Sequence, residues 1–399
     1  MTWRLHLLPG SYGSCLGLVS GKTSQKQDIR HLSSLGARMA SSHHDLALTR
    51  RLSQVNHILL VLSGKGGVGK SSVAAQLALA LLHQRPGSRI GILDIDLTGP
   101  SVPRMLGLQG RSVHQSTDGW VPVQTDFNWN QNDDSQSNKP TSGTLKCMSI
   151  GFLLKDPKDS VVWRGPKKNA MIRQFLTDVR WGELDWLIVD TPPGTSDEHI
   201  SLLEQLSFLF SSQSSALKLP TLSSVLVTTP QAVSLSDVSK EFDFTKKTGL
   251  KVIGLIENMS GYICPHCGQT QNVFGSGGGL AFCEKISAEA GQPSEQLEFL
   301  GAVPLDVEFM KLMDQAMEPN TNGSAETASQ DMVQKYAQTP LISQVFAFSN
   351  FIIPICLKKD CIESIILHSS RGVTSLSNQV GNEENASSQF KCSLPCLKM

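Results

Sequence analysis

The chain has 399 residues, enough for one large α/β domain or two ordinary ones, and either size can bury a full hydrophobic core. Lys plus Arg and Asp plus Glu are equal at 35 each, which argues against a basic surface field for nucleic acid or anionic membranes. The nine cysteines are irregularly spaced, which favours a reducing compartment, and no apolar run reaches the roughly 18 residues of a membrane span.

The first 40 residues are rich in Arg, Lys, His and Ser and contain one acidic residue, Asp28. This composition is typical of a mitochondrial transit peptide. An extension ahead of an alternative start at Met39, or a disordered segment, has the same composition. Residues 1–50 are therefore expected to be a leader or a disordered extension.

Regular structure is expected from about His57, where the first of six short apolar runs begins. These runs predict buried strands at 57–63, 89–96, 185–194, 223–229, 250–259 and 298–306. Residues 71–84 have apolar positions at helical spacing. Strands separated by helix-length segments predict an α/β fold with a mostly parallel, doubly wound sheet and helices on both faces.

Two stretches interrupt this pattern. The polar segment 128–144 predicts a loop or a disordered insert. From about Asn350 the chain loses the strand and helix rhythm. One globular domain is expected at 51–348, followed by an irregular tail at 349–399.

A glycine-rich segment, SGKGGVGKSS at 63–72, lies between the first predicted strand and the first predicted helix. Its backbone N–H groups and the helix N-terminus are suited to binding phosphates. Lys70 is expected to reach the β/γ-phosphates of ATP, and the Ser71 hydroxyl to complete the Mg²⁺ shell. The candidate nucleotide-binding residues here are Gly64, Lys65, Gly66, Gly67, Val68, Gly69, Lys70, Ser71 and Ser72.

Three carboxylates follow predicted strands: Asp94 and Asp96 the second, and Asp190 the third. Carboxylates at the carboxyl ends of parallel strands face the ligand crevice of a doubly wound sheet. A single Asp after a strand is usually a helix cap. Three of them beside a phosphate loop favour a role in metal and nucleotide chemistry.

Residues 264–267 have the sequence CPHC, with Cys264 and Cys267 at its two ends. Such a pair can bind a metal, bind an Fe–S cluster or exchange a disulfide. A disulfide role would place it in a thioredoxin fold, not after a phosphate-loop sheet. A [4Fe–4S] cluster and a structural zinc ion both take four ligands, so the pair must find two more, and Zn²⁺ stays open as an alternative.

Lys65 adds a second lysine to the phosphate loop, and KGGVGKS resembles the deviant Walker A loop of the MinD/Mrp/ArsA ATPases. The resemblance covers most of residues 55–348 and is strongest to the Mrp/Nbp subfamily of cytosolic Fe–S cluster assembly scaffold ATPases. The stretches that carry it are VLSGKGGVGKSSVAAQLAL, ILDIDLTGPSVPRMLGL, VVWRGPKKNAMIRQFL, LDWLIVDTPPGTSDEH, ENMSGYICPHC and FGSGGG.

The resemblance implies catalytic roles for two of these residues. Lys65 would reach the partner subunit's nucleotide in a dimer, and Asp96 would orient or deprotonate the attacking water. Asp94 would support Mg²⁺ indirectly, while Asp190 would hold it through water. Further nucleotide contacts, at the positions where related ATPases bind adenine, would be Asn258, Pro304 and Asp306.

The resemblance also implies that Cys264 and Cys267 bind a [4Fe–4S] cluster together with an identical pair across the dimer axis. The protein would be a weak ATP hydrolase that assembles the cluster and transfers it to apoproteins. The segment before the phosphate loop has only Cys15 and so lacks the four-cysteine motif of the larger paralogue. This chain therefore resembles the shorter paralogue.

Such a protein would form a homodimer or a heterocomplex with the larger paralogous scaffold ATPase, and would meet apo Fe–S proteins or targeting factors. It is expected in the cytoplasm, with no nucleic acid or membrane partner. Two alternatives stay open. One is a mitochondrial cluster carrier of the same family, and the other is a MinD-type partitioning ATPase in which the cysteines are incidental.

Overall fold

The computed structural model of the chain describes residues 46–85, 87–128, 142–154, 164–206, 219–264, 266–267, 269–291, 296–317, 334–336, 339, 345 and 352. The predicted leader up to residue 45, most of the polar insert and nearly all of the predicted tail lie outside these ranges. Among the helices that are described, none has the length and apolar character that a membrane crossing requires.

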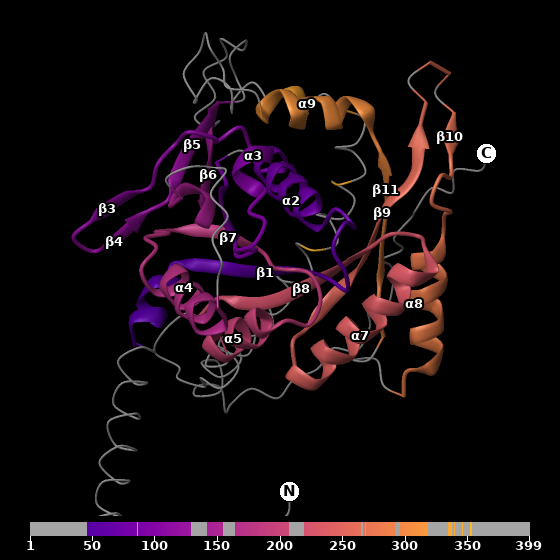
Figure 1. Cartoon of the computed structure of the whole chain (residues 1–399), viewed down its shortest axis with the longest axis horizontal. Coiled ribbons are helices and arrows are strands. Elements are labelled where there is room, and N and C mark those ends of the chain that lie inside the picture. Colours follow the sequence, from indigo (N-terminus) through magenta and orange to yellow (C-terminus); the bar gives the residue numbers. More distant parts are fainter. Residues whose placement is uncertain are drawn as a thin grey trace, which may run out of the picture. The chain divides into compact units, whose positions relative to one another are not determined.

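A nine-stranded sheet runs through the described residues in the order β10-β9-β8-β1-β7-β2-β6-β5, with β11 paired to β9 (Figure 1). The pairs are parallel except for the antiparallel pairs β5–β6 and β9–β10 near its edges. Its strands are β1 (Val55–Ser63), β2 (Arg89–Asp94), β5 (Val123–Asn128), β6 (Ser142–Ser149), β7 (Leu184–Asp190), β8 (Thr221–Thr228), β9 (Val252–Ile263), β10 (Thr270–Gln271) and β11 (Phe299–Leu305). A separate hairpin joins β3 (His114–Ser116) to β4 (Gly119–Val121).

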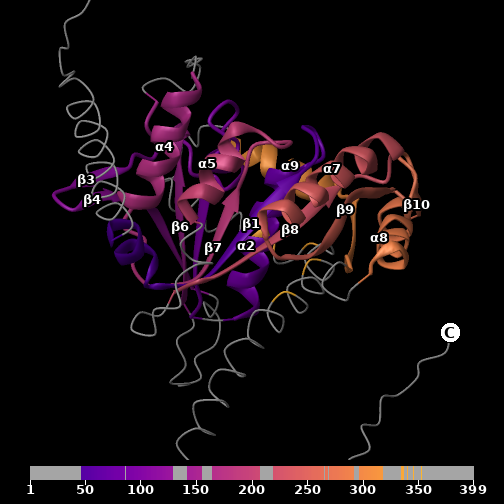
Figure 2. The same ribbon diagram turned by 90° about the horizontal axis from the view of Figure 1, so that it is seen from below.

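Helices cover both faces of this sheet. Figure 1 shows α2, α3 and α9 above it and α4, α5 and α7 below it, and Figure 2 shows this lower layer from beneath. The helices are α2 (Lys70–Gln84), α3 (Val102–Met105), α4 (Gly165–Thr177), α5 (Asp197–Leu206), α7 (Ala232–Thr248), α8 (Gly278–Glu289) and α9 (Val307–Met317). A short helix at 46–52 precedes β1.

The core lies on both sides of the central strands. Every residue of β1 from His57 to Ser63 is buried, as expected for a parallel strand with helices on each face. Leu48 and Leu52, from the helix that precedes β1, belong to the same core cluster and are 0% exposed. A fully buried leucine stabilises the fold by roughly 1.5–3 kcal/mol, so this helix contributes to domain stability.

The six predicted strands and the first helix are confirmed, and so is the mostly parallel, doubly wound fold class. Two strands end earlier than predicted, at Asp94 and Asp190, because the chain turns there to form the site. The loop prediction at 128–144 is wrong at its ends, since Asn128 closes β5 and 142–144 open β6. The domain range 51–348 stays a proposal.

Candidate functional site

The phosphate loop connects the end of β1 at Ser63 to the start of α2 at Lys70. Gly67 and Gly69 have φ values of 79° and 78°, the left-handed region that favours glycine. A Cβ at Gly64 would lie 2.3 Å from the carbonyl carbon of Asp237 in α7. The loop is therefore a tight backbone cradle that only glycine permits at these positions.

Lys70 and Asp190 form a buried ion pair across this loop. The Lys70 ammonium lies 2.5 Å from Oδ1 of Asp190, and the two side chains are 6% and 0% exposed. Burial raises the pKa of Asp190, while the charge of Lys70 and hydrogen bonds from Lys70 and Ser71 oppose that rise. Oδ2 of Asp190 is buried and has no hydrogen-bond partner among the described residues, so it is available to a further donor or to metal-bound water.

Asp94 lies beside Asp190 because the two are register partners on the neighbouring strands β2 and β7. Its carboxylate is 0% exposed and accepts hydrogen bonds from the Ser149 hydroxyl at 3.1 Å and from the backbone N–H of Asp96 at 3.1 Å. Burial, and then the negative charge of Asp190, raise the pKa of Asp94 well above its usual range.

Asp96 is half-buried at the mouth of the crevice. Its Oδ1 accepts hydrogen bonds from the Thr98 hydroxyl at 2.7 Å and from the backbone N–H groups of Thr98 and Gly99. The carboxylate is thus held by its own turn, close to the buried pair of Asp94 and Asp190. Its role toward water stays a prediction.

Lys65 is half-buried on the outer part of the loop. Across the ranges that the structure describes, no ion pair engages its ammonium. A cation on this part of the loop, with no internal partner, is suited to an external anion. Its catalytic role across a dimer stays a prediction.

Asn258, one of the expected adenine contacts, is directed at the phosphate loop. Its side-chain amide donates a 2.8 Å hydrogen bond to the Val68 carbonyl. Pro304 is half-buried near the end of β11, and Oδ1 of Asp306 accepts from the backbone N–H groups of Glu308 and Phe309, which caps α9. Contacts of these three residues with adenine stay a prediction.

The two cysteines of CPHC lie in the β9–β10 hairpin, which extends past the rest of the sheet in Figure 1. Both thiols are free, with Cys264 half-buried and Cys267 exposed. Backbone hydrogen bonds from His266 and then Cys267 lower the pKa of the Cys264 thiol, which favours the metal-binding thiolate. The described residues contain no cluster of three or more His, Cys, Asp or Glu side chains that could hold a metal ion.

Glu257 is a structural link that the sequence motifs did not reveal. Its Oε1 accepts from the N–H of Gly277 at 3.1 Å, and its Oε2 accepts from the N–H of Gly279 at 2.5 Å. Because side chains alternate along a strand, Glu257 binds the glycine loop before α8 while the next residue, Asn258, binds the phosphate loop. These contacts of Glu257 could not be predicted from the sequence, because they depend on which segments lie beside β9 in the fold.

A second unexpected link joins the stretches VVWRGPKKNAMIRQFL and LDWLIVDTPPGTSDEH. Lys168 of α4 lies 2.6 Å from a carboxylate oxygen of Glu198 in α5. His199, next to Glu198, is 1% exposed, and burial followed by the charge of Lys70 lowers its pKa to about 4. At neutral pH His199 is therefore uncharged and adds no further cation behind the phosphate loop.

Comparisons with known proteins agree with this site. Residues 54–340 match the ParA family described as the NUBPL iron-transfer P-loop NTPase. The chain is 56% identical over 278 residues to a cytosolic Fe–S cluster assembly factor CFD1 of Mycosarcoma maydis, covering 68% of each chain. It is 48% identical over 297 residues to the factor nubp2 of Xenopus laevis, covering 74% of this chain and 92% of the relative.

Among solved structures, the chain resembles a nucleotide-binding protein from Archaeoglobus fulgidus in complex with ADP. The two are 32% identical, the match covers 69% of this chain and 94% of the other, and the TM-score is 0.51. The match to the family spans the phosphate loop, the three carboxylates and the CPHC hairpin. This chain belongs to the family of NUBPL-type iron-transfer P-loop NTPases.

Proposed function

We propose that this protein is an ATP-dependent scaffold that assembles a [4Fe–4S] cluster at a dimer interface and transfers it to apoproteins in the cytoplasm. The names of its relatives, cytosolic Fe–S cluster assembly factors, support the proposal. The main structural support for the proposal is that strand β9 connects the phosphate loop to the CPHC turn. This strand contacts the phosphate loop through Asn258 and ends at Ile263, directly before Cys264, the first thiol of CPHC.

The nucleotide site is proposed to bind ATP with Mg²⁺ and to hydrolyse it. The glycine cradle would hold the phosphates, with Lys70 moving from Asp190 to the phosphate oxygens. Ser71 and the unpartnered oxygen of Asp190 fit a magnesium shell, and the metal would neutralise phosphate charge when bound. Asp94 would keep this oxygen oriented, and Asp96 would position water.

The thiol pair is proposed to bind the cluster as half of a shared site. One chain offers Cys264 and Cys267, while a [4Fe–4S] cluster needs four thiolates. A second copy related by a two-fold axis supplies the other two. The same axis would bring Lys65 to the partner's nucleotide, where a second cation stabilises charge on the transferred phosphoryl group.

Coupling between the two sites follows from the shared strand. Phosphate binding that shifts the backbone at Val68 would act on Asn258, and so on the strand that leads to Cys264. Glu257 would carry the same displacement to the glycine loop before α8. A nucleotide-dependent change in the hairpin would then alter the hold on the cluster, which is a coupling of two sites through one element.

The partners proposed are a second copy or the larger paralogous scaffold ATPase, and the apo Fe–S proteins or targeting factors that receive the cluster. The globular unit is proposed to span 51–348, with the short helix at 46–52 attached. The segments that bear on a mitochondrial address or on MinD-type membrane attachment lie almost entirely outside the described residues. Import of a leader fusion into mitochondria, or ATP-dependent sedimentation with liposomes, would favour those alternatives.

The test is anaerobic reconstitution of the full chain with iron and sulfide, followed by gel filtration and analysis of bound iron and acid-labile sulfide. Cys264→Ser and Cys267→Ser should each lose the cluster and keep ATP binding, because the phosphate loop is a separate site. His266→Ala is the matched control in the same turn and should keep the cluster, since it leaves both thiols and the backbone hydrogen bond of residue 266 to Cys264 in place. A full cluster in either cysteine variant would refute the ligand assignment.

A further inference from the structure

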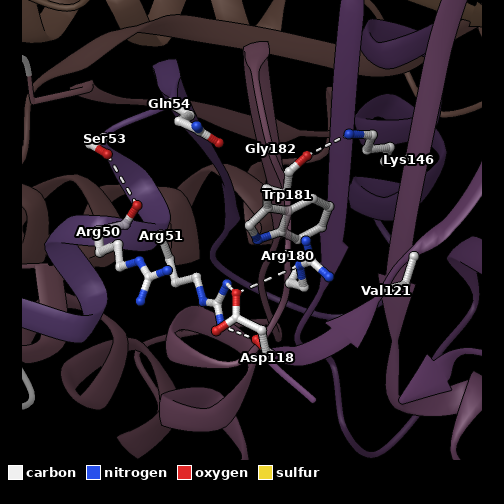
Figure 3. Close-up of a pocket in the computed structure, with 10 residues that line it drawn as sticks. All are labelled: Arg50, Arg51, Ser53, Gln54, Asp118, Val121, Lys146, Arg180, Trp181 and Gly182. Atoms are coloured by element: carbon white, nitrogen blue, oxygen red, sulfur yellow. Dashed lines mark hydrogen bonds and ion pairs between the residues drawn. The ribbon is translucent and has the colours of Figure 1, made fainter. Parts of the chain in front are cut away.

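A pocket of about 560 Å³ lies at the end of the sheet where β1 and β7 begin, away from the phosphate loop at their carboxyl ends (Figure 3). The helix at 46–52 and the turn after it form one wall, and the β3–β4 hairpin, β6 and the turn before β7 form the others. The lining residues are Arg50, Arg51, Ser53, Gln54, Asp118, Val121, Lys146, Arg180, Trp181 and Gly182. Its volume is typical of small-molecule sites.

The lining is strongly cationic, with four basic side chains against the single carboxylate of Asp118. That carboxylate is already engaged. Nη1 of Arg51 lies 3.1 Å from its Oδ2, and Nε of Arg180 lies 3.8 Å from the same atom. The hydrogen bond and charge of Arg51 lower the pKa of Asp118, so it stays ionised and bound to these two arginines.

Two of the four cations have no carboxylate partner in the described ranges. The Arg50 guanidinium is exposed at the pocket rim, makes no ion pair within 4.0 Å in the described ranges, and acts on Asp118 only through its charge. The Lys146 ammonium donates a 2.6 Å hydrogen bond to the Trp181 carbonyl, which leaves further N–H donors. Burial, and then the positive charge of Arg89, lower the pKa of Lys146, so an anion beside it would be stabilising.

The carboxylates near Lys146 are bound elsewhere. Glu183 pairs with Arg89, and Asp126 accepts from the Thr144 hydroxyl at 2.9 Å and from Gln124. Both carboxylates act on Lys146 only through their charge. The local acids therefore leave a net excess of positive charge and hydrogen-bond donors in the pocket.

Trp181 adds a buried donor at the back of the pocket. Its side chain is 0% exposed, and its indole N–H has no hydrogen-bond partner among the described residues. Figure 3 shows the indole nitrogen on the edge of the ring turned toward Arg50 and Arg51. Because the ring and its nitrogen have no accessible surface, Trp181 closes the back of the pocket and is not one of the donors that a ligand reaches.

We propose that this pocket is a second ligand site, which binds a small phosphorylated molecule through its phosphate group. The donors of Arg50 and Lys146 come from two separate segments, the helix at 46–52 and β6, which suits the several oxygens of a tetrahedral dianion. Val121, which is 39% exposed, supplies apolar surface for the rest of the molecule. The site lies apart from the nucleotide and cysteine sites, so its test is independent of the proposed function.

The test is calorimetric titration of the full chain with inorganic phosphate in a Lys70→Ala background, which weakens phosphate binding at the phosphate loop. Arg50→Gln should weaken phosphate binding by about tenfold or more, since it removes a charge-assisted contact. Lys146→Gln should have a similar effect. Lys285→Gln, which makes the same change of charge at an exposed position of α8, should leave the affinity unchanged.

Three results would overturn the proposal. One is an undetectable affinity of the Lys70→Ala chain for phosphate. Another is an equal affinity in Arg50→Gln, Lys146→Gln and their parent. The third is binding of an acidic peptide at the pocket in a chain that ignores phosphate. Arg50 is exposed, so its variant should fold even if Lys146→Gln does not.

Discussion

The buried pair of Lys70 and Asp190 makes a sharp prediction about stability. In the nucleotide-free protein, Lys70→Met removes the cation and leaves a carboxylate that is 0% exposed and has lost the charge 2.5 Å from its Oδ1. Removing one partner of a buried ion pair typically costs about 3–5 kcal/mol. We expect a loss at the lower end, about 3 kcal/mol, which for a domain of this size is a fall in Tm of about 5 °C.

The loss should depend on pH. Burial already raises the pKa of Asp190, and removal of the opposing Lys70 charge raises it further. An acid whose pKa is raised in the folded state favours folding when protonated, and that stability is lost as pH rises from its ordinary value through the folded pKa. Lys70→Met should therefore be closer to the parent at pH 5 than at pH 8.

The assay is thermal unfolding of the nucleotide-free full chain at pH 5 and pH 8, with the double variant Lys70→Met/Asp190→Asn as the control. The double variant lacks both members of the ion pair, so no unpaired Asp190 charge is left, and it should regain most of the lost stability at pH 8. The reasoning is refuted if Lys70→Met matches the parent at pH 8, or if the double variant is no more stable than Lys70→Met.

Three further variants test other contacts. Lys65→Ala should keep ATP binding and lose hydrolysis, and an equally severe loss of ATP binding would contradict action across a dimer. Gly69→Ala should lower ATP affinity and destabilise the fold by about 1–3 kcal/mol, because φ is 78° and the new Cβ would meet the Asn258 amide nitrogen at 2.2 Å. Gly249→Ala, at a φ of 69° with nothing within 4 Å, is the control and should spare ATP binding. Burial raises the pKa of Glu241 to about 7, so the parent should lose stability as pH rises from about 4.5 through 7. Glu241→Gln should remove up to about 3 kcal/mol of that loss in urea unfolding, and an unchanged pH profile would exclude Glu241 as its cause.

The phosphate loop and its carboxylates could be predicted because each is a short contiguous motif attached to a buried strand. The sequence predicts that Lys70 and Asp190 share one site, since both lie at the carboxyl ends of parallel strands that end at the same edge of the sheet. The fold class followed from the same apolar runs.

Other parts of the site depend on strand order, which local patterns do not contain. Asn258 contacts Val68 across 190 positions of sequence, and its amide was expected at adenine. Strand β10 has only two residues, too few for a hydrophobic pattern. Strand β5 was not predicted because it leads directly into the polar segment 128–144. The basic pocket brings together Arg50, Lys146 and Trp181, which no motif connects.

The central claim is that one cluster is shared between two chains through Cys264 and Cys267. Native mass spectrometry of the anaerobically reconstituted full chain measures this directly, because it gives the number of chains and clusters in each particle. We expect a dimer with a single [4Fe–4S] cluster, and we expect Cys264→Ser to lose that cluster. A monomer that retains a complete cluster, or a dimer with one cluster on each chain, would contradict it.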